Sequence, residues 1–226
     1  MKNRVSLCLA VVFCVFGTVA AVAQMPARYP IKADDGDAIA NFDLKPAVSA
    51  RLDKLPGKVA VGNMNGDVTL MQFYDLNCPY CREAAADIDT LVRSDNKLKL
   101  VFVPYAVLSV ASVRGAMVEI AAAKQLTPEQ YLDFHKRIYA NRGTIDGPKV
   151  LAAAKDMGLD PERLAGIANT EATLNVLRDN ATSGGEAGLA ATPAYVIDGV
   201  AIVGHPGLKS LQSVVRSVRA CGKVVC

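Results

Sequence analysis

The sequence predicts an α/β fold in which a block of helices is inserted into a single sheet-forming domain. Strand, helix and strand patterns follow one another within residues 68–103, helical patterns fill residues 106–182, and a hairpin followed by a helix occupies residues 194–219. A strand–helix–strand unit of this length implies parallel pairing of its two strands. We therefore expect the βαβ segment and the ββα segment to form one sheet, with a helical subdomain inserted between them.

The first sheet-forming segment has clear boundaries. Residues 68–74 are a run of β-forming residues after the turn at 65–67, which predicts a buried strand. A short edge strand is expected at 59–61, and a second buried strand at 98–103. Between the two buried strands, a helix is expected to begin at Pro79, with apolar residues at helical spacing.

The helical block is marked by start signals. Thr127-Pro128-Glu129-Gln130 is a capping box with proline at the first helical position, and the pairs Asp146/Pro148 and Asp160/Pro161 repeat that pattern. In the helix before them, one apolar stripe is expected to contain Val110, Val113, Met117 and Ile120.

After Gly184-Gly185 the pattern returns to strands. Residues 194–197 and 200–203 flank Asp198-Gly199, a two-residue sequence typical of a β-hairpin. A last helix is expected after Gly207.

The N-terminal segments differ in composition from the rest. Residues 1–23 have the pattern of a secretory signal peptide: basic residues, an apolar run too short to span a bilayer, and Ala21-Val22-Ala23 before Gln24. An uncleaved membrane anchor is the alternative. Residues 24–57 are rich in proline and glycine and are interpreted as an arm with one short helix at 46–55. The domain is expected to span 58–226, and a signal peptide implies export to the periplasm.

Composition excludes several classes of protein. Apolar residues make up 51% of the chain, which excludes a disordered chain, and 25 basic against 22 acidic residues give a formal charge of +3. The chain therefore lacks the excess of basic residues that is typical of nucleic-acid-binding proteins. The six cysteines are the informative part of the composition.

Cys78-Pro79-Tyr80-Cys81 lies between a predicted strand and a predicted helix. The first helical turn has unpaired N–H groups and the positive end of the helix dipole, which stabilise a thiolate at Cys78. Cys81 follows one turn later and can reach back to form a disulfide. The pair therefore predicts redox chemistry, with Cys78 as the accessible nucleophile. The alternatives are a structural disulfide and a zinc site in which Cys221 and Cys226 supply the other two thiolates.

The chain resembles the DsbA family of bacterial periplasmic thiol–disulfide oxidoreductases. The resemblance is carried by residues 73–81, Phe-Tyr-Asp-Leu-Asn-Cys-Pro-Tyr-Cys, and by residues 191–197, Ala-Thr-Pro-Ala-Tyr-Val-Ile. It covers about residues 59–219 and is closer to the branch of the copper-tolerance protein ScsC than to the DsbA prototype. It implies a thioredoxin-like fold with a helical insertion and no cofactor.

The resemblance also implies how substrates are handled. Thr192-Pro193 would be a cis peptide facing Cys78, and the backbone of Thr192 would pair with an extended substrate segment. Apart from the resemblance, Pro79 and Tyr80 are expected to contact substrate at the active-site turn, where Tyr80 could also tune Cys78; a plain surface residue is the alternative for Tyr80. Exported proteins with thiols or disulfides would be the substrates, and a membrane oxidase would be the redox partner. The direction of exchange stays open between oxidase, isomerase and reductase, and a chaperone-like binding protein is the alternative of another class.

The remaining candidates carry weaker expectations. Cys221 and Cys226 are expected to form their own structural disulfide, with a second redox pair as the alternative. His135 is expected to be a partly buried structural residue, and His205 a turn residue near the active-site rim. The two histidines give no basis for a metal site.

One position departs from the family. Thioredoxin-fold oxidoreductases usually carry a carboxylate six residues before the first active-site cysteine, and this chain has Gln72 there. A glutamine cannot exchange a proton near neutral pH. We therefore expect Gln72 to favour the Cys78 thiolate and to slow steps that need Cys81 deprotonated.

Overall fold

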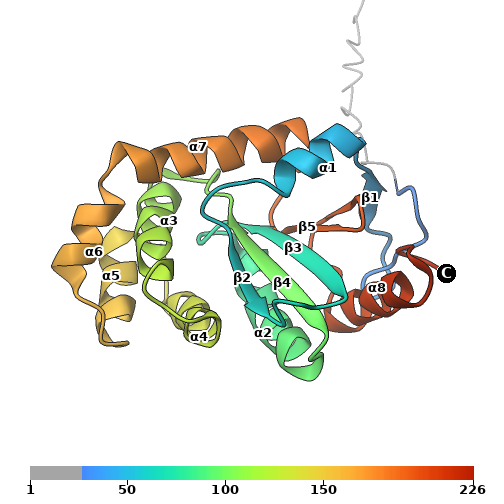
Figure 1. The fold of residues 1–226 in the computed structure, drawn as a ribbon, viewed down its shortest axis with the longest axis horizontal. Helices are drawn as coiled ribbons and strands as arrows, with labels where there is room; N and C mark the ends of the chain where they lie inside the picture. The colour runs from blue at the N-terminus through green and yellow to red at the C-terminus, as the bar shows by residue number, and fades with distance from the viewer. Residues whose placement is uncertain (1–26) are drawn as a thin grey trace, which may run out of the picture.

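The computed structural model describes residues 27–226. The expected signal peptide at 1–23, with Cys8 and Cys14, lies outside the described residues. Eight helices surround a six-stranded sheet in the described part (Figure 1). In chain order the elements are β1 (Ala40–Asp43), α1 (Pro46–Leu52), β2 (Val59–Gly62), β3 (Val68–Tyr74), α2 (Pro79–Ser94), β4 (Leu98–Pro104), α3 (Val110–Ala123), α4 (Pro128–Tyr139), α5 (Gly147–Lys155), α6 (Pro161–Ala168), α7 (Glu171–Glu186), β5 (Ala194–Ile197), β6 (Val200–Val203) and α8 (Leu208–Cys221).

Both sheet-forming halves join in one sheet, as predicted. Its strand order is β1-β6-β5-β3-β4-β2, with β2 at one edge. β3 and β4 are parallel, while β3 pairs with β5, and β5 with β6, in antiparallel register. The β5–β6 hairpin turns at Asp198 and Gly199, which have φ of 48° and 73°. Two positive φ angles suit the hairpin turn that this sequence predicts.

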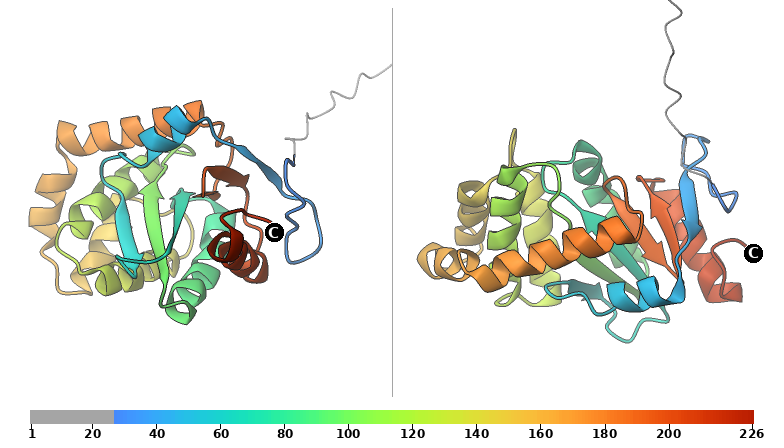
Figure 2. Two further views of the ribbon diagram at one scale, coloured as in Figure 1. Left: turned by 45° about the vertical axis from the view of Figure 1, so that its right-hand side comes forward. Right: turned by 90° about the horizontal axis from the view of Figure 1, so that it is seen from above.

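Helices cover both faces of the sheet (Figures 1 and 2). One face packs against α2 and α8, and the other against α1 and the end of α7. Helix α4 also packs against β2 and α2, while α3, α5 and α6 pack on one another beside the sheet. The active-site segment between β3 and α2 thus lies where the sheet meets this helical block.

The predicted helix starts are present with their caps. Thr127 and Gln130 form the reciprocal capping box of α4, and the side chains of Asp146 and Asp160 cap α5 and α6. Each satisfies backbone N–H groups that a free helix end leaves unpaired. The apolar stripe predicted for α3 is wrong at Val110, which is 68% exposed because it begins the helix at the molecular surface.

Strand β1 was not predicted within the segment 24–57. It pairs antiparallel with β6, from Ala40↔Val203 to Asp43↔Val200. Its one fully buried residue is Asn41, whose side chain bonds backbone groups of Tyr29 and Ile39. A polar inward residue removes the apolar alternation by which a strand is recognised in sequence. Helix α1 is present but ends at Leu52, three residues before the predicted end.

No helix in the described part of the chain combines the length and the apolar character that a membrane crossing requires.

Candidate active site

The two cysteines of the CxxC sequence sit at the junction of β3 and α2. β3 is buried over most of its length, which fixes the point at which the chain leaves the sheet. Cys78 is the N-cap residue of α2, with extended φ and ψ of −78° and 121°, and Pro79 follows at the first helical position. Proline there suits the start of a helix because its N–H would be unpaired in any case. Cys81 consequently lies in the first turn, on the buried side of α2.

Cys78 is the more acidic of the two thiols. A hydrogen bond from the side chain of Cys81 is the main cause that lowers the pKa of Cys78 from 9.0 to about 6, and burial opposes it. Thr192 and the backbone N–H groups of Tyr80 and Cys81 add to the lowering. The helix start thus stabilises a thiolate at Cys78, as the sequence predicts.

Cys81 behaves in the opposite way. Burial, and then the hydrogen bond to Cys78, raise the pKa of the Cys81 thiol far above its ordinary value. Exposure separates the two residues little, since Cys78 is 4% exposed and Cys81 is 1% exposed. Exposure alone therefore does not distinguish the two thiols, contrary to the prediction that Cys78 is the accessible one. They differ instead in pKa, which is lowered for Cys78 and raised for Cys81.

The loop before β5 closes over Cys78. The Thr192–Pro193 peptide bond is cis, and the carbonyl oxygen of Thr192 accepts a hydrogen bond from the Cys78 thiol at 3.0 Å. The carbonyl of Pro193 accepts a hydrogen bond from Gly204 N–H at 2.9 Å, which anchors the loop to the end of β6. Residues 114 positions apart in sequence thus meet at the sulfur.

Asp75 organises the turn before Cys78 and was not identified from the sequence. Its buried carboxylate accepts hydrogen bonds from the N–H groups of Asn77, Val107 and Leu108 at 2.8–2.9 Å. Its backbone carbonyl accepts bonds from Cys78 N–H and from the Tyr139 hydroxyl, each at 3.1 Å. An aspartate just before a helix is a known turn former, which is the signal that could have indicated it.

Asn77 connects the same turn to the helical block. Its side-chain amide donates to Ser112 Oγ and to the Ile145 carbonyl, and its oxygen accepts from Ile145 N–H at 2.7 Å. The cysteine-bearing turn is therefore held by both the sheet and the inserted helices.

Exposed apolar side chains occur at the cysteine-bearing turn and in segment 107–110, whose Val107 and Leu108 N–H groups bond the Asp75 carboxylate before Cys78. Pro79 is exposed, Tyr80 is 63% exposed, and Val107, Leu108 and Val110 are also exposed. Solvent-exposed apolar residues gathered in one place mark binding surfaces in proteins. We call Tyr80, Val107, Leu108 and Val110 the apolar rim.

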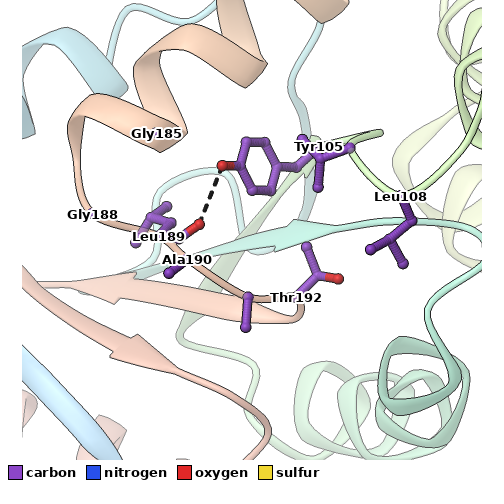
Figure 3. A pocket seen from close by; sticks show the side chains of 9 residues that line it. Tyr105, Leu108, Gly185, Gly188, Leu189, Ala190 and Thr192 are labelled. Carbon is purple, nitrogen blue, oxygen red and sulfur yellow. Dashed lines mark hydrogen bonds between the residues drawn. The ribbon is translucent and has the colours of Figure 1, made fainter. Parts of the chain in front are cut away.

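A pocket of about 300 Å³ adjoins this rim (Figure 3). Tyr105, Leu108 and Thr192 line it together with the chain between α7 and β5. The Tyr105 hydroxyl donates to the carbonyl of Leu189 at 3.1 Å. Thr192 therefore belongs both to the cysteine site and to the pocket wall.

Cys221 and Cys226 form a disulfide at the other end of the molecule. Arg219, two residues before Cys221, bonds both carboxylate oxygens of Asp95, the C-cap of α2. The 16 residues of α2 make a helix about 24 Å long, with Cys78 at its start. The four-cysteine zinc alternative is therefore wrong, and the second-redox-pair alternative receives no support from this placement.

No metal cluster appears elsewhere in the described residues. Across residues 27–226, His, Cys, Asp and Glu side chains form no group of three or more suited to a metal ion.

The two histidines occupy different environments. His135 is buried and its Nδ1 lies 2.8 Å from Glu119 Oε1, within a cluster that includes the Tyr131 hydroxyl. It is structural, as predicted, although more deeply buried. His205 lies between Tyr195 and Asp87, at 2.8 Å and 3.0 Å. That arrangement was not predicted.

Gln72 is buried on the face of the sheet that carries α2. It stands opposite Tyr195 in the β3–β5 register and beside Phe102 in the β3–β4 register. Its side-chain oxygen has no hydrogen-bond partner among the described residues.

A family profile described as thioredoxin matches residues 54–217. The chain belongs to the thioredoxin family. The expected thioredoxin-like fold is therefore confirmed.

Solved structures of the thioredoxin family align with most of the chain. A thioredoxin-like oxidoreductase from Silicibacter pomeroyi DSS-3 is 30% identical, with a TM-score of 0.68, over 75% of this chain and 96% of that one. The thiol-disulfide exchange protein alpha-DsbA2 from Wolbachia pipientis is 23% identical, with a TM-score of 0.68, over 76% and 93%. The catalytic domain of Proteus mirabilis ScsC is 21% identical, with a TM-score of 0.66, over 76% and 96%. The fold is thus shared with DsbA-like and ScsC proteins, as the resemblance implied.

One curated sequence also matches. It is named Na(+)/H(+) antiporter NhaA, from Herminiimonas arsenicoxydans, and is 22% identical over 179 residues. The match covers 78% of this chain, and this chain spans 27% of that protein's length.

Proposed function

We propose that this thioredoxin-family protein is a thiol–disulfide oxidoreductase that exchanges disulfides in exported proteins through Cys78 and Cys81. The observation that carries the proposal is the opposed acidity of the two thiols at the start of α2. The pKa of Cys78 is lowered to about 6, whereas burial raises that of Cys81. This difference makes Cys78 the attacking or attacked sulfur and Cys81 the resolving one.

The exchange follows from this assignment. A substrate thiolate attacks the Cys78 sulfur of the oxidised pair, a mixed disulfide forms, and the electron pair of the broken bond leaves on Cys81, which takes up a proton. A second substrate thiolate then attacks the substrate sulfur and releases Cys78 as a thiolate. The substrate is oxidised and the protein reduced. A membrane oxidase would restore the Cys78–Cys81 disulfide.

The surface around Cys78 suits an extended protein segment with apolar side chains. Thr192 would supply backbone pairing to such a segment, with Pro193 fixing the loop, while Pro79, Tyr80 and the rest of the apolar rim would contact its side chains. In this proposal the substrates are exported proteins with thiols or disulfides, and no cofactor or nucleic acid takes part. The signal peptide expected at 1–23 supports export to the periplasm.

The low pKa of Cys78 favours the oxidising direction. A stabilised thiolate stabilises the reduced protein, and this makes its disulfide a better oxidant. The reduction potential of the Cys78–Cys81 pair tests the direction. A value of about −120 mV supports an oxidase, whereas about −200 mV or lower supports an isomerase or reductase.

The apolar rim also favours a second candidate function, client binding without redox chemistry. Cys78→Ser separates the two functions in one experiment. Loss of both thiol oxidation and insulin reduction with this variant supports the oxidoreductase. The opposite result would favour the binding protein and overturn our proposal. In that case the wild-type protein would show no measurable exchange activity, and Cys78→Ser would suppress client aggregation as well as the wild type does.

A further inference from the structure

A proton must leave Cys81 whenever this residue resolves a mixed disulfide. Cys81 is 1% exposed, and burial raises the pKa of its thiol. Gln72 occupies the position from which a buried carboxylate could accept that proton, and a glutamine amide does not titrate near neutral pH. The resolving step therefore needs another acceptor.

A hydrogen-bonded chain leads from this part of the core to the surface. The Tyr195 hydroxyl lies 2.8 Å from His205 Nδ1, and His205 Nε2 lies 3.0 Å from Asp87 Oδ2. Tyr195 is fully buried, the side chain of His205 is 13% exposed, and that of Asp87 is 37% exposed. The three residues come from β5, the turn after β6 and α2, and they meet only in the folded protein.

Tyr195 belongs to the same buried core cluster as the two cysteines. It is two residues after Pro193 and stands opposite Gln72, on the sheet face that packs against α2. Burial raises the pKa of Tyr195 well above its ordinary value, and negative charges on Cys81, Asp87 and Cys78 raise it further. The side-chain oxygen of Gln72, which stands opposite Tyr195, has no hydrogen-bond partner among the described residues. A buried acceptor without a partner is rare in folded proteins, so this part of the core is a second indication of a functional polar site.

We propose that Tyr195, His205 and Asp87 form a proton-transfer chain that accepts the proton of Cys81 during resolution of the mixed disulfide. The inference rests on the proposed function and deepens it. The Cys81 sulfur attacks Cys78, a Cys78–Cys81 bond forms, and the bond from Cys78 to the substrate sulfur breaks with its electron pair on that sulfur. The Cys81 proton passes to the Tyr195 oxygen as the tyrosine proton passes to His205 Nδ1. The Asp87 carboxylate stabilises the resulting imidazolium.

The chain assigns separate roles to its members. Tyr195 and His205 transfer the proton, whereas Asp87 is a positioning residue that holds His205 through Nε2. The same groups would return a proton to Cys81 when the pair is reduced.

Other charged groups lie beside the His205 turn. Asp34 accepts hydrogen bonds from the N–H groups of Lys209 and Ser210, and its own N–H donates to the Pro206 carbonyl. Glu83 is on the same helix as Asp87, one turn earlier. Among the described residues, the groups that hydrogen-bond with the His205 side chain are Asp87 from α2 and Tyr195 from β5.

We would test the inference with Ellman's reagent, an aromatic disulfide that reacts with the reduced full-length protein in two phases. In the first phase Cys78 attacks the reagent and releases one aromatic thiolate. In the second phase Cys81 resolves the mixed disulfide and releases another. The second phase is intramolecular, so its rate does not depend on reagent concentration. We would follow it between about pH 5 and pH 9, across the ordinary titration range of histidine.

Two variants remove the chain without a large change in shape. Tyr195→Phe keeps the ring and removes the hydroxyl, and His205→Asn keeps an acceptor for Tyr195 but cannot take up a proton. With either variant we expect the second phase at neutral pH to slow on the order of 10- to 100-fold, a modest general-base effect because water can replace part of it. The first phase should be unchanged. Asp87→Asn should move the acidic limb of the second-phase profile to lower pH, because it removes the anion that stabilises protonated His205.

Tyr131→Phe is the matched control, since it removes a hydroxyl of another fully buried tyrosine, in α4. It should leave both phases unchanged. If Tyr195→Phe and His205→Asn fold but resolve at the wild-type rate and with the wild-type pH profile, the proton-transfer chain is wrong. If the first phase is absent in the wild-type protein, the proposed function fails instead. Should Tyr195→Phe not fold, His205→Asn alone decides.

Discussion

The sulfur of Cys78 lies 3.0 Å from the carbonyl oxygen of Thr192. This contact serves the thiol, which can donate a hydrogen bond to the carbonyl. The thiolate is instead stabilised first by the side chain of Cys81, despite the opposing effect of burial, with further help from the side chain of Thr192 and the N–H groups of the first turn of α2. The two protonation states of Cys78 thus use different partners, and the donors that favour the thiolate outweigh the effect of burial.

The first prediction concerns the thiolate itself. Iodoacetamide should label Cys78 and leave Cys81 unmodified, and the labelling rate should rise with pH through about 6, the pKa of Cys78. Cys81→Ala should raise that pKa because it removes the main donor, whereas Cys81→Ser keeps a hydroxyl donor and should raise it less. Mass mapping and thiolate absorbance provide the two measurements. Preferential labelling of Cys81 would contradict the assignment of roles.

The second prediction concerns stability and pH. The pKa of Cys78 is about 6 in the folded protein and 9.0 in an unperturbed thiol, so the thiolate stabilises the fold fully above about pH 9 and this contribution disappears as the pH falls through 6. Such a change is worth about 4 kcal/mol, compared with about 2 kcal/mol for closing a four-residue disulfide loop. We therefore expect reduced protein to melt at a higher temperature than oxidised protein at pH 8, and the difference to shrink or reverse at pH 5. A difference that does not vary with pH would show that the thiolate is not stabilised.

The third prediction concerns the C-terminal disulfide. Replacing Cys221 and Cys226 together by serine should lower the free energy of unfolding by about 2 kcal/mol or less, because the ring is short and exposed. Thiol oxidation and insulin reduction should keep their rates, since the pair lies at the opposite end of α2 from Cys78. Denaturant unfolding and turnover assays measure the two effects. A large loss of turnover in a folded variant would favour a relay of electrons between the two pairs.

The fourth prediction uses two neighbouring glycines of α7. A methyl group at Gly184 would lie 2.5 Å from the ring of Tyr105, whereas one at Gly185 would meet open space. Gly185→Ala should stabilise the helix by up to about 1 kcal/mol. Gly184→Ala should destabilise the protein by about 1–3 kcal/mol through overpacking, and should also weaken peptide binding because Tyr105 lines the pocket. Equal effects of the two variants on stability and on peptide binding would contradict the close packing of α7 on Tyr105.

The fifth prediction concerns Gln72. A glutamate at this buried position could take a proton from Cys81 directly, and its negative charge would oppose the Cys78 thiolate. Gln72→Glu should therefore speed the second phase of the aromatic disulfide reaction and raise the pKa of Cys78. In a Tyr195→Phe background it should restore part of the lost rate. If neither the rate nor the thiolate titration changes, Gln72 is a packing residue.

Local sequence patterns predicted the elements that depend on local chemistry. The CxxC turn, the capped helices and the Asp198-Gly199 hairpin all depend on residues within a few positions of one another. Strand β1 was missed because its buried residue is Asn41, whose hydrogen bonds to backbone groups replace apolar packing. The bond between His205 and Asp87 spans 118 positions, and no local pattern indicates it.

Strand β1 has a consequence for how the protein behaves when it is shortened. Without residues 40–43, one side of β6 would present a row of unpaired N–H and C=O groups to solvent. Such an open edge is a template for pairing with another chain and favours aggregation. In the intact protein, β1 covers β6, and a bridge between Ala27 and Asn41, with a hydrogen bond from Arg28 N–H to the Asn41 carbonyl, covers part of β1 in turn. The proline- and glycine-rich segment before the CxxC domain thus protects the sheet against edge-to-edge association.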